Sequence, residues 1–144
     1  MDNLTTYITE KLKIKNDFMF EKLKISSKSK FYSCQPKTRE ELRKILTERL
    51  AKDKNADLND IDVSQIDNMS MIRGNGLFED LDPHNIDISE WDVSNVKTMR
   101  CMFFECENFT GKGLENWNVS NVKDMSYMFD GCISLKNKPS WYKE

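Results

Sequence analysis

Apolar residues recur at helical spacing in two stretches of the C-terminal part of the chain. The first stripe is Val96, Met99, Met102, Phe103 and Cys106, in which successive members are three, three, one and three residues apart. This spacing places the side chains on one face of a short helix. A second stripe repeats the spacing with Val122, Met125, Met128, Phe129 and Cys132. Each pattern therefore predicts a short helix with one buried face.

Polar and alternating residues come before each stripe. Ser94 and Ser120 stand just ahead of the stripes, and Ser64 is their earlier counterpart. A serine hydroxyl at this place can accept a hydrogen bond from an amide of the first helical turn, so we predict these serines as N-caps. The segments 85–91 and 114–119 lead into tryptophans and predict short strands.

The same unit occurs three times along the chain. Residues 61–69, 91–99 and 117–125 align with offsets of 30 and then 26 residues, and the first copy loses the pattern after Ile72. A period in this range is typical of a repeat fold in which each unit buries its apolar face against its neighbours. We predict an α/β fold, a short leucine-rich-repeat-like solenoid of about three repeats in residues 57–144.

A further helix is predicted ahead of the repeats, within residues 34–56. Pro36 precedes it, Thr38 and Glu41 form a capping box, and Leu42, Ile45, Leu46 and Leu50 make an apolar stripe. A terminal repeat would otherwise expose its stacking face to water, so we predict that this helix caps the N-terminal end of the solenoid. A helix that binds a partner is the alternative.

The repeated unit also carries a family resemblance. The pattern Trp-Asp/Asn-Val-Ser-Asn-Val-Lys-x-Met-x-x-Met-Phe-x-x-Cys resembles the BspA-like repeat, a leucine-rich-repeat relative of bacterial surface proteins, mycoplasma lipoproteins and phage or prophage genes. The resemblance covers residues 57–144 and implies a right-handed solenoid that is used for binding rather than catalysis. It also implies, as one alternative, a relative of bacterial surface adhesins.

Residues 1–33 form a basic leader. Leu4, Tyr7, Ile8 and Leu12 lie on one helical face, while the alternation in residues 11–15 also suits a short strand. The leader resembles the N-terminal tags of proteins packaged into the heads of large tailed phages, in which a protease cuts after a triplet such as Ile8, Thr9 and Glu10. The alternatives are a helix that docks on the solenoid or on a dimer mate, and a mobile tail.

Charge and composition narrow the classes of partner. Residues 1–54 carry a net charge of +6 and residues 55–144 a net charge of −8. Duplex binding needs a basic face, so the acidic repeats argue against nucleic acid as the main partner. No apolar run is long enough to span a membrane, and we find no signal-peptide core. We predict no membrane association, no Sec export, and a location in the host bacterial cytoplasm or a phage virion.

Few residues in the sequence are of the types that form catalytic or metal sites. The chain has one histidine, His84, and four cysteines without a CxxC pair, so we predict no catalytic site, no metal site and no cofactor. Cys106 and Cys132 hold equivalent places and predict buried thiols. The aspartates at 57, 60 and 62 lack the glycine and distal glutamate of an EF-hand loop, which favours a turn with aspartate caps.

Protein binding is the function that these patterns favour. A contact surface is predicted on the strand face and its loops, although two recurring tryptophans are also typical of a core. Its residues are Asp87, Glu90, Trp91, Asp92, Glu115 and Trp117. One hypothesis is a phage or prophage virion protein whose mature chain begins at Lys11. The other is a soluble inhibitor or adaptor that binds a host protein, such as a defence factor, and keeps its leader. In either case the leader could make oligomer contacts.

Overall fold

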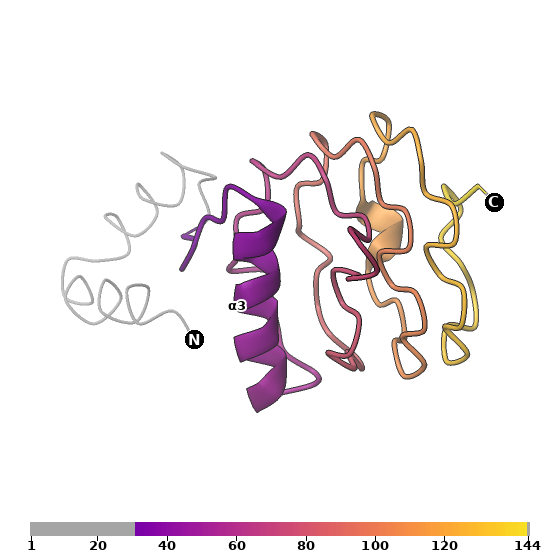
Figure 1. The fold of residues 1–144 in the computed structure, drawn as a ribbon, viewed down its shortest axis with the longest axis horizontal. Helices are drawn as coiled ribbons and strands as arrows, with labels where there is room; N and C mark the ends of the chain where they lie inside the picture. The colour runs from indigo at the N-terminus through magenta and orange to yellow at the C-terminus, as the bar shows by residue number, and fades with distance from the viewer. Residues whose placement is uncertain (1–30, 144) are drawn as a thin grey trace, which may run out of the picture.

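A computed structural model describes residues 31–143 of the chain (Figure 1). Two helices occur in this part: α3, Arg39–Lys52, and a 3-10 helix, η1, Leu114–Asn116. The remaining described residues form turns, bends and isolated bridges. In Figure 1, α3 stands at one end of a stack of loops, and the C-terminal segment lies at the other end.

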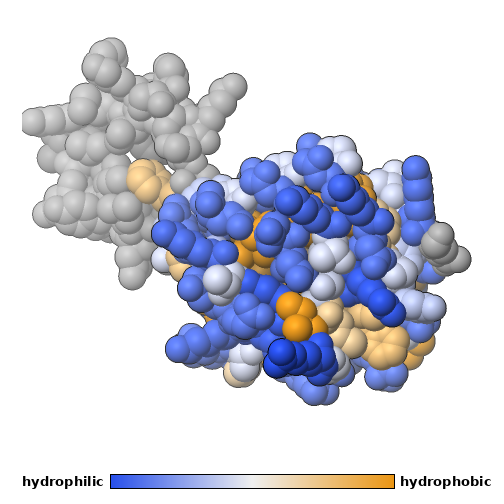
Figure 2. All heavy atoms as spheres, turned by 45° about the horizontal axis from the view of Figure 1, so that its top comes forward, coloured by the Kyte–Doolittle hydropathy of each residue, from blue (hydrophilic) through white to orange (hydrophobic). Residues whose placement is uncertain are grey.

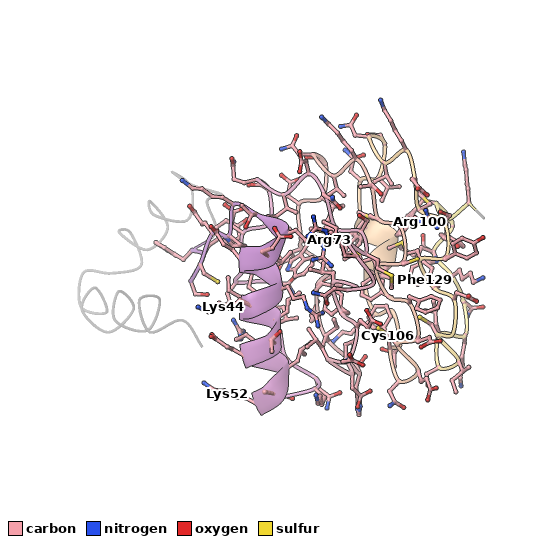
Figure 3. All side chains as sticks on the ribbon, viewed as in Figure 1. Lys44, Lys52, Arg73, Arg100, Cys106 and Phe129 are labelled. Carbon is pink, nitrogen blue, oxygen red and sulfur yellow. The ribbon has the colours of Figure 1, made fainter. Side chains whose placement is uncertain are left out.

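The helix α3 forms where the sequence predicts one. The Thr38 hydroxyl accepts a hydrogen bond from the Glu41 amide at 3.1 Å, and the Glu41 carboxylate accepts one from the Lys37 amide at 2.8 Å. Two amides at the helix start are thereby satisfied. The leucines at 42, 46 and 50 are fully buried against the stack. Lys44 and Lys52 lie on the side of α3 that faces away from it (Figure 3).

Residues 54–135 form three irregular coils, stacked one on the next. We name them coil A (residues 54–83), coil B (84–109) and coil C (110–135). The first residues of successive coils are in register, since the His84 amide donates to the Lys54 carbonyl at 2.8 Å and the Thr110 amide to the His84 carbonyl at 3.2 Å. Parallel bridges join Asn68 to Thr98 and Thr98 to Asp124. The spatial period of the coils is therefore the sequence period of 30 and 26 residues.

The predicted fold class, an α/β leucine-rich-repeat-like solenoid, is wrong. No β-strand forms in residues 31–143, where parallel pairing is limited to isolated bridges. The segment 85–91 is turn and bridge, and η1 occupies the start of the predicted strand at 114–119. The two apolar stripes lie in consecutive turns instead of short helices. Each repeat thus lacks both the strand and the helix that such a solenoid requires.

Short polar side chains explain why the repeats form turns. Ser64, Ser94 and Ser120 cap no helix: their amides donate to the side chains of the residues two positions earlier, at 3.0, 3.0 and 3.1 Å. An aspartate or asparagine that binds the amide two residues ahead closes a turn and competes with helix formation. Cys101 and Tyr127 also have a φ of 56°, in the left-handed region, which interrupts a right-handed helix within each stripe.

A row of stacked tryptophans fixes the coils in register. The Trp91 indole donates to the Leu58 carbonyl of coil A at 2.9 Å, and the Trp117 indole to the Ile88 carbonyl of coil B at 2.8 Å. The two rings lie 6.3 Å apart and are tilted by 7°. Both tryptophans are 4% exposed. They are core residues, as the alternative interpretation of their recurrence predicts.

Phenylalanine and cysteine form a second row inside the stack. The rings of Phe78, Phe103 and Phe129 follow one another at 4.8 and 5.8 Å. The Cys132 thiol lies 3.0 Å from the Phe103 carbonyl of coil B, and the Cys106 thiol lies 3.9 Å from the Phe78 carbonyl of coil A. Figure 3 shows Cys106 and Phe129 in the half of the stack toward the C-terminus. The predicted burial of both cysteines is confirmed.

We expect Trp117→Phe to lower the free energy of unfolding by about 1–3 kcal/mol, because the Ile88 carbonyl would stay buried without its indole donor. Urea unfolding, followed by circular dichroism, measures the change. Trp141→Phe is the matched control. The Trp141 indole makes the same bond to the Leu114 carbonyl, but this side chain is only half-buried and water can replace the donor. Equal losses of stability in the two variants would contradict the conclusion that the Trp117 indole bond is buried and the Trp141 bond is accessible to water.

Candidate functional site

The predicted contact residues gather at one corner of coils B and C. Trp91 and Trp117 are stacked at equivalent places, and the acidic residues flank them in the chain. The two indoles are buried, so they offer no contact surface. Glu90, Asp92 and Glu115 are exposed, and Asp87 is half-buried. The structure therefore brings the acidic members of the set to the surface and places its aromatic members inside.

Two carboxylates at this corner, those of Asp87 and Glu115, accept hydrogen bonds from other residues of the stack. Asp87 accepts hydrogen bonds from the Ser89 hydroxyl at 2.7 Å and the Ser89 amide at 3.1 Å, and it lies 3.7 Å from the Lys112 ammonium. Glu115 accepts bonds from the Ser140 amide and hydroxyl. Hydrogen bonds from Ser89 and Asn59 stabilise the charged form of Asp87 and lower its pKa to about 2.

A different surface stands out at the end of the stack, where coil C has no described coil after it. The apolar side chains Val93, Val96, Met99 and Phe109 of coil B are at most 1% exposed because coil C covers them. Their equivalents in coil C are only half-buried. These equivalents are Val119, Val122, Met125 and Leu135. We call this surface, together with the outward backbone of residues 125–131, the C-terminal edge.

Four backbone amides of the C-terminal edge lack a described acceptor, although one of them belongs to the buried residue Phe129. In coil B, alternate amides from Met99 to Glu105 donate to carbonyls of coil C at 2.7 to 3.0 Å. The equivalent amides of coil C donate to no residue within 31–143, and they belong to Met125, Tyr127, Phe129 and Gly131. Two large apolar side chains beside them are well exposed, Tyr127 at 57% and Ile133 at 79%. The edge thus offers donors and apolar surface together.

The face drawn in Figure 2 is mostly hydrophilic, and apolar atoms reach it in scattered areas. Around the C-terminal edge the charge also changes sign. Residues 55–116 carry 4 basic against 13 acidic side chains, whereas residues 117–143 carry 4 basic against 2 acidic ones. Residues 117–143 thus carry a net charge of +2, next to a net charge of −9 in residues 55–116.

Sequence reasoning missed the C-terminal edge, although the repeat contained a signal for it. The third copy of the unit carries the same apolar stripe as the second. Residues 139–143 cover part of coil C: Trp141 stacks on Trp117 at 6.2 Å, the Tyr142 ring lies 5.0 Å from the Phe129 ring, and the Lys143 amide lies 3.5 Å from the Met125 sulfur. Among the described residues, the stripe of coil C is less covered than that of coil B.

A hollow of about 590 Å³ between α3 and coil A is lined in part by Arg39, Arg43 and Arg73. Arg39 donates to the Ser70 and Asn75 carbonyls, and burial lowers its pKa. Arg43 donates to carbonyls of residues 76, 77 and 79. Because these two guanidinium groups already bind backbone carbonyls of coil A, the hollow is the place where α3 is attached to coil A.

Other chemistry is sparse in the described part of the chain. The His84 imidazole lies 3.0 Å from the Asp82 carboxylate in an exposed loop. Burial raises the pKa of the Cys106 thiol well above its usual range and that of Cys132 to about 11, which keeps both protonated. Within residues 31–143, no three His, Cys, Asp or Glu side chains are placed to hold a metal ion. Neither described helix has the length and apolar content to cross a bilayer.

The predicted leader falls almost entirely outside the described residues. Ile8, Thr9 and Glu10, the predicted cleavage triplet, are among residues 1–30. Cleavage of the leader and its role in oligomer contacts therefore stay predictions.

Comparison with known proteins identifies the family to which the repeats belong. The family model described as "Mycoplasma protein of unknown function, DUF285" matches residues 40–143, which include most of α3 and all three coils. The chain belongs to this family. No curated protein and no solved structure matches this DUF285 protein. The resemblance stated above is confirmed at the level of the family, while the BspA-like repeat itself and the phage tag stay predictions.

We expect this DUF285 protein to lose stability as the pH falls from about 4 to about 2. The folded state lowers the pKa of Asp87, so its ionised form stabilises the fold above the ordinary pKa, and protonation removes that contribution. Urea unfolding at a series of pH values should show a smaller acid loss in Asp87→Asn. In Ser89→Ala, NMR titration should move the Asp87 pKa toward its ordinary value, and an unchanged pKa would contradict the assigned cause.

Brief labelling with iodoacetamide should distinguish the cysteines. Cys34 is half-buried and we expect it to be alkylated in the folded chain, whereas Cys106 and Cys132 should react only after unfolding because they are buried and protonated. Mass spectrometry of tryptic peptides locates the label. Cys34→Ser serves as the control, since it should remain almost unlabelled until urea is added. Rapid labelling of Cys106 in that variant would contradict the burial of its thiol beside the phenylalanine rings.

Proposed function

We propose that this chain is a non-enzymatic protein-binding module, and that it binds a segment of a partner protein along the C-terminal edge. One observation carries the proposal. The edge presents the same kinds of group by which coil B holds coil C, namely a row of amides and a stripe of valine, methionine and large apolar side chains, and no described coil covers them.

An edge of this kind is suited to binding by addition of a segment. Main-chain hydrogen bonds along an exposed edge supply affinity, and apolar side chains beside them supply specificity. Val122 and Met125 would take the buried positions that Val96 and Met99 hold in coil B, both of which are 0% exposed. Covering them removes apolar surface from water, which favours association.

The wider setting of this binding stays a prediction. The hypotheses are a phage virion protein, an inhibitor or adaptor in the host cytoplasm, and a relative of surface adhesion proteins. Family membership supports a repeat protein and is compatible with each setting. The acidic corner around Glu90 and Asp92 is a second surface that a partner could contact. The C-terminal edge is the better candidate because backbone amides there lack a described acceptor.

Selection from a displayed library of random 12-residue peptides tests the proposal. We expect the full chain to enrich a set of peptides and Val122→Asp to lose it, because a carboxylate in the apolar stripe opposes burial of the bound segment. Val122 is half-buried, so the variant should keep its fold, which circular dichroism and urea unfolding verify.

Lys44→Asp is the matched control. It introduces the same carboxylate on the outer side of α3, at the other end of the stack, and should enrich the same peptides as the unaltered chain. Enrichment of the same peptides by folded Val122→Asp would overturn the assignment of the edge. A chain that enriches no peptide would overturn segment binding.

A further inference from the structure

The hollow between α3 and coil A collects three arginines around one carboxylate. Its lining residues are Arg39, Glu40, Arg43, Ile72, Arg73 and Asn75. Three guanidinium groups against one carboxylate leave a net charge of +2 on the walls of a space of about 590 Å³. Figure 3 shows Arg73 between the helix and the coils. We call this space the arginine hollow, and it lies at the opposite end of the stack from the C-terminal edge (Figure 1).

Arg73 is an isolated basic residue in an acidic coil. It is the only lysine or arginine among positions 55–83, where seven side chains are acidic. The backbones of Ile72 and Asn75 bond to each other in both directions, at 3.1 and 2.9 Å, and close a two-residue turn. Arg73 and Gly74 form this turn with φ of 53° and 74°, the left-handed conformation that such a tight turn requires. The turn thus fixes the backbone of Arg73 beside the arginines of α3.

Backbone carbonyls bind the two helix arginines without neutralising their charge. The guanidinium groups of Arg39 and Arg43 donate to carbonyls between residues 70 and 79, and a carbonyl carries no net charge. The Glu40 carboxylate lies 3.9 Å from Arg39, and its side chain is 70% exposed. Arg43 and Arg73 form no ion pair with a carboxylate of residues 31–143. Most of the positive charge in the arginine hollow therefore has no described counter-charge.

The third arginine of α3 shows the kind of pairing that the hollow lacks. Arg49 donates through Nη1 and Nη2 to the two oxygens of the Asp60 carboxylate, each at 3.0 Å. Hydrogen bonding to Asp60 raises the pKa of Arg49, whereas burial lowers the pKa of Arg39 and the like charge of Arg43 adds to the decrease. Arg39 is only 5% exposed. Because a buried cation is costly without a counter-charge, an anion in the hollow would stabilise Arg39 as Asp60 stabilises Arg49.

The donors, the charge and the size of the arginine hollow define the ligand. The Nη1 group of Arg39 donates to no described acceptor, and Arg73 makes no described hydrogen bond. Guanidinium groups bind the oxygens of phosphates and carboxylates in pairs. A phosphate monoester carries a charge of about −2 at neutral pH, which matches the excess on the walls, whereas a carboxylate cancels half of it. The volume of the hollow is in the range of pockets that hold small organic ligands, and Ile72 supplies an apolar wall.

We propose that the arginine hollow binds the phosphate group of a phosphate monoester. Arg73 is its main ligand, Arg39 and Arg43 supply supporting charge, and Ile72 contacts the organic part. The Glu40 carboxylate opposes binding by repulsion. This inference goes beyond the proposed function, because the hollow and the C-terminal edge lie at opposite ends of the stack. A small-molecule ester and a phosphorylated side chain of a partner protein present the same group, and the test below distinguishes them.

Phenyl phosphate, inorganic phosphate and benzoate are titrated into the ¹⁵N-labelled full chain in phosphate-free buffer and followed by NMR. We expect phenyl phosphate to bind with a Kd below about 1 mM and to shift the backbone amides of Ile72, Arg73 and Gly74. Benzoate has the same ring and a single charge, so it should bind about tenfold more weakly. Inorganic phosphate should shift the same amides but bind more weakly than phenyl phosphate, because it has no organic part to contact Ile72.

Three variants test the roles of the lining residues. Arg73→Gln should keep its fold, since Arg73 is exposed, and should bind phenyl phosphate about tenfold more weakly. Glu40→Gln removes the opposing carboxylate and should bind about threefold more tightly, a gain that loss of folding does not produce. Arg100→Gln is the matched control. It removes the same charge from an exposed arginine of coil B, farther from α3 than Arg73 in Figure 3, and should bind as the unaltered chain does.

Unchanged affinity in folded Arg73→Gln, or equal affinity for benzoate and phenyl phosphate, would overturn the inference. So would equal binding of inorganic phosphate and phenyl phosphate, because the ligand would then need no organic part. A five-residue peptide with a central phosphotyrosine distinguishes the two sources of the ester. Tighter binding of this peptide than of phenyl phosphate would uphold the site and assign a phosphorylated protein to it, and weaker binding would uphold the site for a small molecule. The displayed library tests the C-terminal edge separately, so either proposal can fail alone.

Discussion

Backbone hydrogen bonding between successive coils is the constraint on which the rest of this structure depends. From Met99 to Glu105 coil B donates and coil C accepts, whereas the amides of Thr110, Lys123 and Ser134 in coil C donate to coil B. A buried backbone group without a partner is costly, so each coil needs a neighbour on both of its faces. This is why arginines of α3 bind carbonyls of coil A.

Side chains that recur in the repeat keep successive coils in register. The Asn95 amide donates to the Ser64 carbonyl at 2.8 Å, and Asn121 donates to Ser94 at 2.6 Å. The tryptophan indoles make a second series of bonds, from Trp91 to the Leu58 carbonyl and from Trp117 to the Ile88 carbonyl. The indole bonds satisfy buried carbonyls and the asparagine bonds join exposed groups, and together they allow the coils to stack without a regular sheet.

The predicted corner and the C-terminal edge differ in how far their groups already have partners within the stack. At the corner, Trp91, Trp117 and the carboxylate of Asp87 all have partners within the stack. At the C-terminal edge, amides of coil C have no described acceptor, and the apolar stripe has no described coil against it. The proposed site is thus located by the groups that lack a described partner, more than by the residue types that recur.

The sequence by itself determined the repeat period, the capped helix α3, the burial of the two cysteines and the apolar stripes, because each depends on spacing along a short stretch of chain. It did not determine the form of the backbone. The stripe from Val96 to Cys106 fits a helix, but the turn closed by Asp92 and the left-handed φ at Cys101 and Glu105 are stable only when coil C supplies carbonyls to the freed amides. Those carbonyls come from residues 25 positions further along the chain, so only the tertiary structure decided between helix and turn, and only it showed which amides lack an acceptor.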